Sequence, residues 1–100
     1  MYLVLLKFSA NKKQAGEFMA GHKEWIKQGL DEGVFLLIGS MQGTSASDMQ
    51  GGSVLAHNCD LQELQDRVNS DPFVKEDVVQ AEIIIISPNQ TDERLSFLLN

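Results

Sequence analysis

The sequence has little of several things that would narrow its class. Its 100 residues include one cysteine, Cys59, so no internal disulfide can form and no cysteine-based metal site is suggested. Positive charge is also scarce, because 8 Lys and Arg are outnumbered by 14 Asp and Glu, which gives a net charge of −6. Nucleic acid and anionic membranes both attract basic faces. We therefore expect neither as the main partner.

Targeting and membrane-spanning patterns are missing as well. The start, Met1 to Val4, has no basic residue ahead of its apolar run, so we do not interpret it as a signal peptide. No apolar run approaches the roughly 20 residues that a membrane-spanning helix needs. The simplest expectation is a single-domain cytoplasmic protein. A domain this small buries only about 60–65% of the surface of its unfolded chain, which favours further burial in an oligomer.

Hydrophobic periodicity predicts alternating strands and helices. Asp60 with Glu63 and Asn11 with Gln14 resemble capping boxes, and Gly33 supplies a left-handed residue after the first helix. The pattern predicts strands over 2–8, 34–38, 53–58 and 78–86, helices over 11–32 and from 60 onward, and a short helical turn after Asp71-Pro72.

This order, βαββαβ, predicts an α+β, ferredoxin-like domain over residues 1–88. We expect a four-stranded antiparallel sheet with two main helices on one face. The strands are apolar on both faces; Leu3 and Leu5, for example, oppose Tyr2 and Val4. Because two helices cover one face only, we predict a homodimer packed sheet to sheet, of the dimeric α/β-barrel type. The alternative is that the tail, 89–100, which could form one short helix, covers the open face.

Two histidines are candidates for chemistry. His22 lies on the apolar stripe of the first helix, either as a core histidine with a satisfied hydrogen bond or as a general acid/base. Asp71 is the carboxylate that could orient it, although Asp-Pro at a helix start is also ordinary N-cap chemistry. His57 is expected at a strand end or edge. Neither histidine forms a metal-binding pattern with a nearby carboxylate, so we expect no metal and no cofactor.

The other motifs point to chemistry less directly. The serines have no nucleophile-elbow context, and the glycines match no phosphate-binding loop. The long polar segment Gly39–Gly52 is expected to be a connection that is functional or mobile. Met41 and Met49 either pack under it or line a pocket. Trp25 and Phe73 are expected in the core rather than stacked on a cofactor.

Several short sequence motifs occur in a fixed order between Tyr2 and about Pro88. They are Gly21-His22-Lys23, the Gly33 stop, a strand ending at Gly39, Gly51-Gly52, and Asp71-Pro72-Phe73. Together they resemble the YciI-like proteins, the YCII-related domain family, whose members have a ferredoxin-like fold and form dimers or larger oligomers. The resemblance implies that His22 and Asp71 approach each other in a cleft as an active-site pair. Ser40 stands where the family often has proline, so we expect a different shape beside the cleft.

Three functions stay open. The first is a metal-free enzyme acting on a small molecule by elimination, isomerisation or hydrolysis, with His22 as general acid/base and Asp71 orienting it. The second is a non-catalytic metabolite-binding or accessory module that acts as a homo-oligomer, and the third is a structural subunit. Related ferredoxin-like dimers include cofactor-free oxygenases, lactone isomerases and enzymes of chlorinated aromatic compounds, which is an analogy of fold. The residues that we predict to bind substrate are Gly39, Ser40, Met41 and Phe73.

Overall fold

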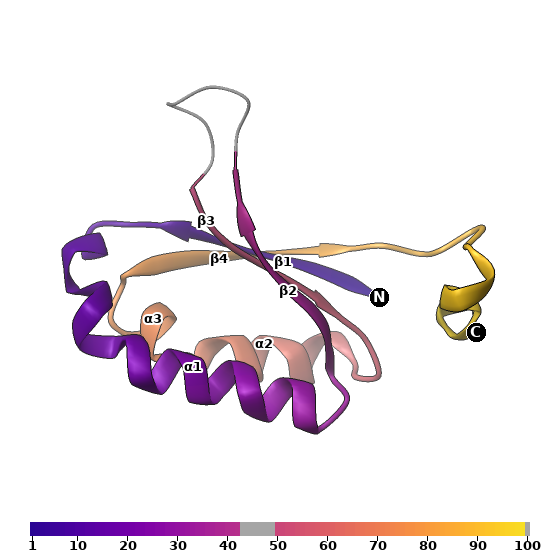
Figure 1. Cartoon of the computed structure of the whole chain (residues 1–100), viewed down its shortest axis with the longest axis horizontal. Coiled ribbons are helices and arrows are strands. Elements are labelled where there is room, and N and C mark those ends of the chain that lie inside the picture. Colours follow the sequence, from indigo (N-terminus) through magenta and orange to yellow (C-terminus); the bar gives the residue numbers. More distant parts are fainter. Residues whose placement is uncertain (43–49, 100) are drawn as a thin grey trace.

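A computed structural model describes residues 1–42 and 50–99 of the chain. The four strands form one antiparallel sheet in the order β2-β3-β1-β4, with the helices α1, α2 and α3 on one side of it (Figure 1). The ferredoxin-like α+β fold is therefore confirmed. The elements are β1 (Tyr2–Phe8), η1 (Lys12–Gln14), α1 (Ala15–Asp31), β2 (Phe35–Met41), β3 (Gly51–Ala56), α2 (Leu61–Asn69), α3 (Pro72–Lys75), β4 (Val79–Ile85) and η2 (Glu93–Leu99).

The core lies between the sheet and the helices. Strand β1 is central, and its Val4 pairs with Val54 of β3 and with Ile83 of β4. Alternate residues of β1 and β3 point toward the helices, where they are buried. The helices and the segment after α3 contribute further large buried side chains, which are Trp25, Leu64, Val68, Phe73 and Val78, and β2 contributes Phe35.

The helix ends follow the sequence in two places and depart from it in one. The capping box at the start of α2 is confirmed, because the Glu63 amide donates to Asp60 at 2.8 Å and the Asp60 amide donates to Glu63 at 2.9 Å. Gly33, with φ of 75°, ends α1 as expected. The capping box at Asn11 is wrong, since the Asn11 side chain donates instead to the backbone carbonyl of Glu76 at 2.8 Å. A 3₁₀ turn therefore precedes α1.

The sheet extends into the segment expected as a loop. Strand β2 continues to Met41 and β3 begins at Gly51, so only the middle of the polar segment connects them. Gly51 has a φ of 137°, and a Cβ there would clash with the carbonyl oxygen of Leu6, so this pairing requires glycine. Met49 lies outside the described residues.

The face of the sheet away from the helices carries one apolar row across all four strands. The row consists of Leu37, Leu55, Leu3 and Ile84, which are neighbours in the strand register. Leu37 is 55% exposed and Ile84 is 39% exposed. The tail helix η2 lies beyond the end of the sheet rather than over this row (Figure 1), and its Phe97 ring contacts His57, with ring centroids 5.5 Å apart.

Candidate active site

The centre of the candidate site is a contact between α1 and the start of α3. His22 Nδ1 lies 2.8 Å from Asp71 Oδ1. The Asp71 side chain is fully buried, and the His22 side chain is 13% exposed. Asp71 also caps α3, because its Oδ1 accepts a hydrogen bond from the Phe73 amide at 3.0 Å. One carboxylate oxygen thus serves both the helix cap and the histidine.

Small and rigid neighbours allow this contact. Pro72 occupies the first position of α3, where its fixed φ suits a helix and its missing N–H is not needed. Gly21 lies next to His22 on α1, and a Cβ on Gly21 would be 3.0 Å from Pro72 Cγ. A larger residue at position 21 would therefore push the two helices apart. The Gly-His and Asp-Pro pairs act together to bring the imidazole to the carboxylate.

Aromatic side chains fix the plane of the imidazole. The Phe73 ring lies 4.0 Å from the His22 ring, centroid to centroid, and the two planes differ by 5°. The Trp25 ring is stacked more loosely, at 5.8 Å and 22°. Phe73 is itself buried, so its position is set by the core. The ring of His22 consequently has little freedom to rotate.

The hydrogen bond to Asp71 also sets the tautomer of His22. A carboxylate only accepts hydrogen bonds, so Nδ1 must carry the proton in this contact. Nε2 is then the nitrogen with a free lone pair, which is the arrangement that a general base needs. The second carboxylate oxygen, Asp71 Oδ2, is buried without a hydrogen-bond partner among the described residues. Among the described residues, the carboxylate therefore makes its hydrogen bonds through Oδ1 alone, with His22 and with the Phe73 amide at the start of α3.

His22 lines a cavity of about 450 Å³ between α1 and one end of the sheet. Of the residues predicted to bind substrate, Gly39, Ser40 and Phe73 also line it. Asp71 lies behind His22 and does not line it. Met41 is the last residue of β2 and is likewise not a lining residue. The rest of the lining combines apolar side chains with glycine and one lysine, namely Phe8, Met19, Lys23, Ile26, Ile38, Gly51 and Gly52.

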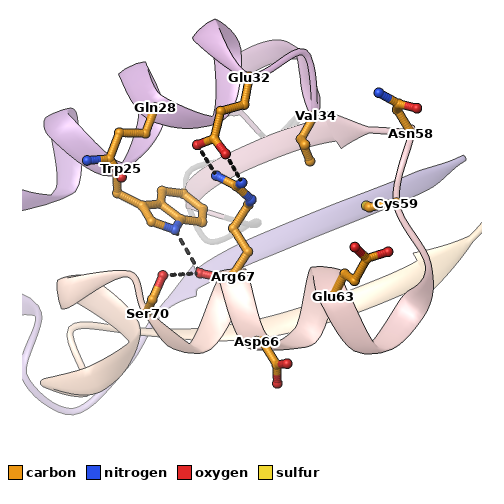
Figure 2. A pocket seen from close by; sticks show the side chains of 10 residues that line it. All are labelled: Trp25, Gln28, Glu32, Val34, Asn58, Cys59, Glu63, Asp66, Arg67 and Ser70. Carbon is orange, nitrogen blue, oxygen red and sulfur yellow. Dashed lines mark hydrogen bonds and ion pairs between the residues drawn. The ribbon is translucent and has the colours of Figure 1, made fainter.

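A second hollow, of about 550 Å³, lies between α1 and α2 (Figure 2). Two of its charged groups are paired with each other, because Arg67 donates to the Glu32 carboxylate through both of its terminal nitrogens, at 3.0 and 3.3 Å. The Arg67 carbonyl accepts from Trp25 Nε1 at 2.8 Å and from Ser70 Oγ at 2.6 Å. No sequence pattern marks this hollow, because Arg67 is far in the chain from both Trp25 and Glu32. It lacks a pair comparable to His22 and Asp71.

Cys59 also lines the second hollow. Burial raises the pKa of its thiol, the Glu63 carboxylate raises it further, and Arg67 works against them. A thiol with a raised pKa is a poor nucleophile at neutral pH. Cys59 is thus a weak candidate for covalent chemistry.

The described residues hold neither a metal-ligand cluster nor a membrane-spanning helix. Over residues 1–42 and 50–99, no three side chains of His, Cys, Asp or Glu gather where they could hold a metal ion. Within the same ranges, no helix has both the length and the apolar character to cross a bilayer.

Comparison with known proteins gives a family and a similar fold. A family model, the YCII-related domain, matches residues 1–87. No curated protein matches the chain. Among solved structures, 5-chloro-2-hydroxyhydroquinone dehydrochlorinase (TftG) from Burkholderia phenoliruptrix AC1100, in complex with 2,5-dihydroxybenzoquinone, is similar, with a TM-score of 0.65 and 16% identity. The match covers 86% of this chain and 93% of that one.

Proposed function

The chain belongs to the YCII-related domain family, and from that premise we propose that it is an enzyme that transfers protons on a small molecule in the His22 cavity. His22 is the general acid/base and Asp71 orients it. The observation that carries the proposal is the 2.8 Å contact between His22 Nδ1 and Asp71 Oδ1 behind a ring that lines an apolar cavity. Buried, oriented histidines beside a cavity suit acid/base work.

The chemistry follows from the free Nε2 of His22. In an elimination, Nε2 takes a proton from one substrate atom, the released electron pair forms a new double bond, and the leaving group departs from the neighbouring atom with its own electrons. Asp71 then stabilises the imidazolium that has formed. Isomerisation starts with the same proton removal. The similar structure is a dehydrochlorinase by name, which favours elimination among these classes.

Proton transfer of this kind needs neither a metal nor an organic cofactor, and we propose that the enzyme uses none. In hydrolysis, the third class, Nε2 would take a proton from water while the water oxygen bonds to an electrophilic substrate atom. The bond from that atom to the leaving group would break, and the leaving group would keep the electron pair and take the proton back from the imidazolium. Gly39, Ser40 and Phe73 are proposed to contact or shape the bound substrate, since all three line the cavity. Met41, the last residue of β2, follows Ser40 in the chain, and we propose that it also contacts the substrate.

The test is a thermal-shift screen of a metabolite panel, followed by a turnover assay on every compound that binds. His22→Gln and Asp71→Asn are compared with His57→Gln, which removes the histidine that contacts the tail. We expect turnover to fall by at least about a hundredfold in the first two variants, as for lost acid/base catalysis, and to persist in the third. A ligand that is recovered unchanged would favour the binding module, and normal turnover in His22→Gln would disprove the proposal.

A second copy of the chain is the proposed partner. The apolar row Leu37, Leu55, Leu3 and Ile84 is open to solvent at both ends, and η2 does not cover it. An antiparallel sheet exposes a polar face when that face meets water. A sheet-to-sheet homodimer would bury the row.

A further inference from the structure

We propose that the His22 cavity accepts a ring-sized apolar molecule with one anionic oxygen, for which Gly52 leaves the room and Lys23 provides the charge. The inference deepens the proposed function, on which it rests, by naming the substrate class. Three independent features support it: a missing side chain in β3, exposed apolar walls, and a lysine in a lining whose described residues include no acidic side chain.

Gly52 is a glycine that the backbone does not require. It pairs with Leu6 and Ser40 on the face of the sheet that looks toward α1. A Cβ at Gly52 would meet only the Gly39 carbonyl oxygen, at an ordinary 3.8 Å. The next residue on the same face of β3, Val54, fills its space with a fully buried side chain. The absent side chain at Gly52 therefore leaves the cavity open, in contrast to Gly51, where the backbone itself demands glycine.

The walls of the cavity are suited to an apolar ring. Phe8 is 38% exposed and Met19 is 36% exposed, and both line the cavity together with Ile26 and Ile38. Large apolar side chains that stay exposed around a hollow of several hundred Å³ are typical of ligand sites. A flexible polar metabolite would leave these walls unsatisfied.

Lys23 adds a positive charge to the described lining of the cavity. Among the described residues that line the cavity, none is acidic. Lys23 takes part in no ion pair within the described part of the chain, whereas Lys27, one helical turn on, is paired with Asp31 at 2.8 Å. In a protein of net charge −6, Lys23 is thus a positive group that an anion in this cavity would meet.

The anion that fits is an oxygen on the apolar body: a carboxylate, a phenolate or an enolate. When His22 removes a proton next to a carbonyl or hydroxyl group, negative charge develops on that oxygen. Lys23, the neighbour of His22 on α1, would stabilise this charge. Lys12, whose Nζ lies 4.8 Å from the centroid of the Phe8 ring, adds a second positive group near the rim.

The test uses benzoate and benzamide, which share a ring and differ in charge, in NMR titrations of the ¹⁵N-labelled full chain. We expect the wild type to bind benzoate about tenfold more tightly than benzamide, the size of one charge-assisted hydrogen bond at a partly exposed site. The largest shifts should fall on the amides of Gly39 and Gly52. Lys23→Met should abolish the preference, and the control Lys27→Met should keep it.

The room at Gly52 is tested with two graded variants. Gly52→Ala should weaken the binding of both probes, and Gly52→Val should abolish it while the thermal midpoint stays the same or rises. Equal binding of the two probes to the wild type, no binding of either, or a preference retained in Lys23→Met would overturn the inference. Because these readouts need no turnover, failure here leaves the acid/base proposal standing, and selective binding without turnover would disprove only the latter.

Discussion

The imidazole ring of His22 lies flat against the phenyl ring of Phe73, with centroids 4.0 Å apart and planes within 5° of parallel. Phe73 follows Asp71 by two residues, so one short turn of chain supplies both contacts of the imidazole. Asp71 binds its edge through Nδ1, and Phe73 packs against its face. The edge contact sets which nitrogen carries the proton, and the face contact sets where the other nitrogen points. Helix α3, only four residues long, thus acts as the positioning element of the site.

The first prediction concerns the tautomer of His22 in Asp71→Asn. Because Asp71 Oδ1 accepts from both the Phe73 amide and His22 Nδ1, an asparagine oxygen in its place can keep both hydrogen bonds. We expect the proton to stay on Nδ1 and the fold to be kept, while the variant loses the negative charge that stabilises an imidazolium. Long-range ¹H–¹⁵N NMR spectra of the ring nitrogens measure the tautomer directly, with His57 as the internal reference. A proton that moves to Nε2 in the variant would contradict our account of the pair.

The closeness of His22 and Asp71 could not have been derived from local pattern. The two residues are separated by 49 positions, and each has an ordinary local explanation, as a core histidine and as an N-cap. Only the resemblance to a family implied that they meet. The role of Phe73 was missed in part, since a core position was expected and a stack on His22 was not. Such a stack depends on the angle between α1 and α3, which no periodicity encodes.

The second prediction concerns the contact between α1 and β2. A Cβ on Gly29 would clash with the ring of Phe35, so Gly29→Ala overpacks the core although alanine favours helices. We expect the free energy of unfolding to fall by about 1–2 kcal/mol, the overpacking penalty less the gain in helix propensity. Gly16→Ala is the matched control, because nothing lies within 4 Å of a Cβ there. It should raise the same free energy by about 0.5 kcal/mol in urea denaturation. Equal effects of both substitutions would refute the tight packing.

The fold itself was largely predictable, because it depends on local signals. Alternating apolar residues and the Asp60 cap act over a few positions, and each gave the element that the structure has. The failures are tertiary. Asn11 caps no helix because its side chain binds the Glu76 carbonyl, 65 residues away. The start of β3 has the composition of a loop, because it begins with Gly51 and Gly52. These glycines belong to the strand only because they pair with Lys7 and Leu6 of β1, and the local sequence does not show that pairing.

The third prediction concerns the apolar row on the open face. Leu37→Asp places a charge at the β2 end of the apolar row, within the proposed sheet-to-sheet contact, where it would be buried without a partner. We expect this variant to be monomeric in sedimentation-equilibrium experiments in which the wild type is a dimer, because an unpaired buried charge is expensive. Leu30→Asp is the control: Leu30 is also well exposed, at 44%, but lies on α1 in the helix layer. A wild type that is monomeric at micromolar concentration would rule out the dimer.

The fourth prediction concerns the reactivity of Cys59. Burial and the Glu63 carboxylate raise the pKa of the thiol, so the folded chain holds less thiolate at pH 7–8 than an ordinary cysteine. We expect native Cys59 to react with Ellman's reagent more slowly than the same residue in the urea-unfolded chain. Glu63→Gln, which keeps a side chain able to complete the capping box, should speed the native reaction, whereas Glu17→Gln on α1 should leave it unchanged.

The same shift links Cys59 to stability. A group whose pKa is raised by folding contributes stability below its unfolded pKa and loses it as the pH rises through the folded value. Cys59→Ser, with no thiol to ionise in this range, should therefore lose less stability than the wild type as the pH increases above the ordinary thiol range. Urea denaturation at a series of alkaline pH values measures the difference. Parallel pH profiles for the two proteins, or a native thiol as reactive as the unfolded one, would show that the hollow between α1 and α2 does not disfavour the thiolate.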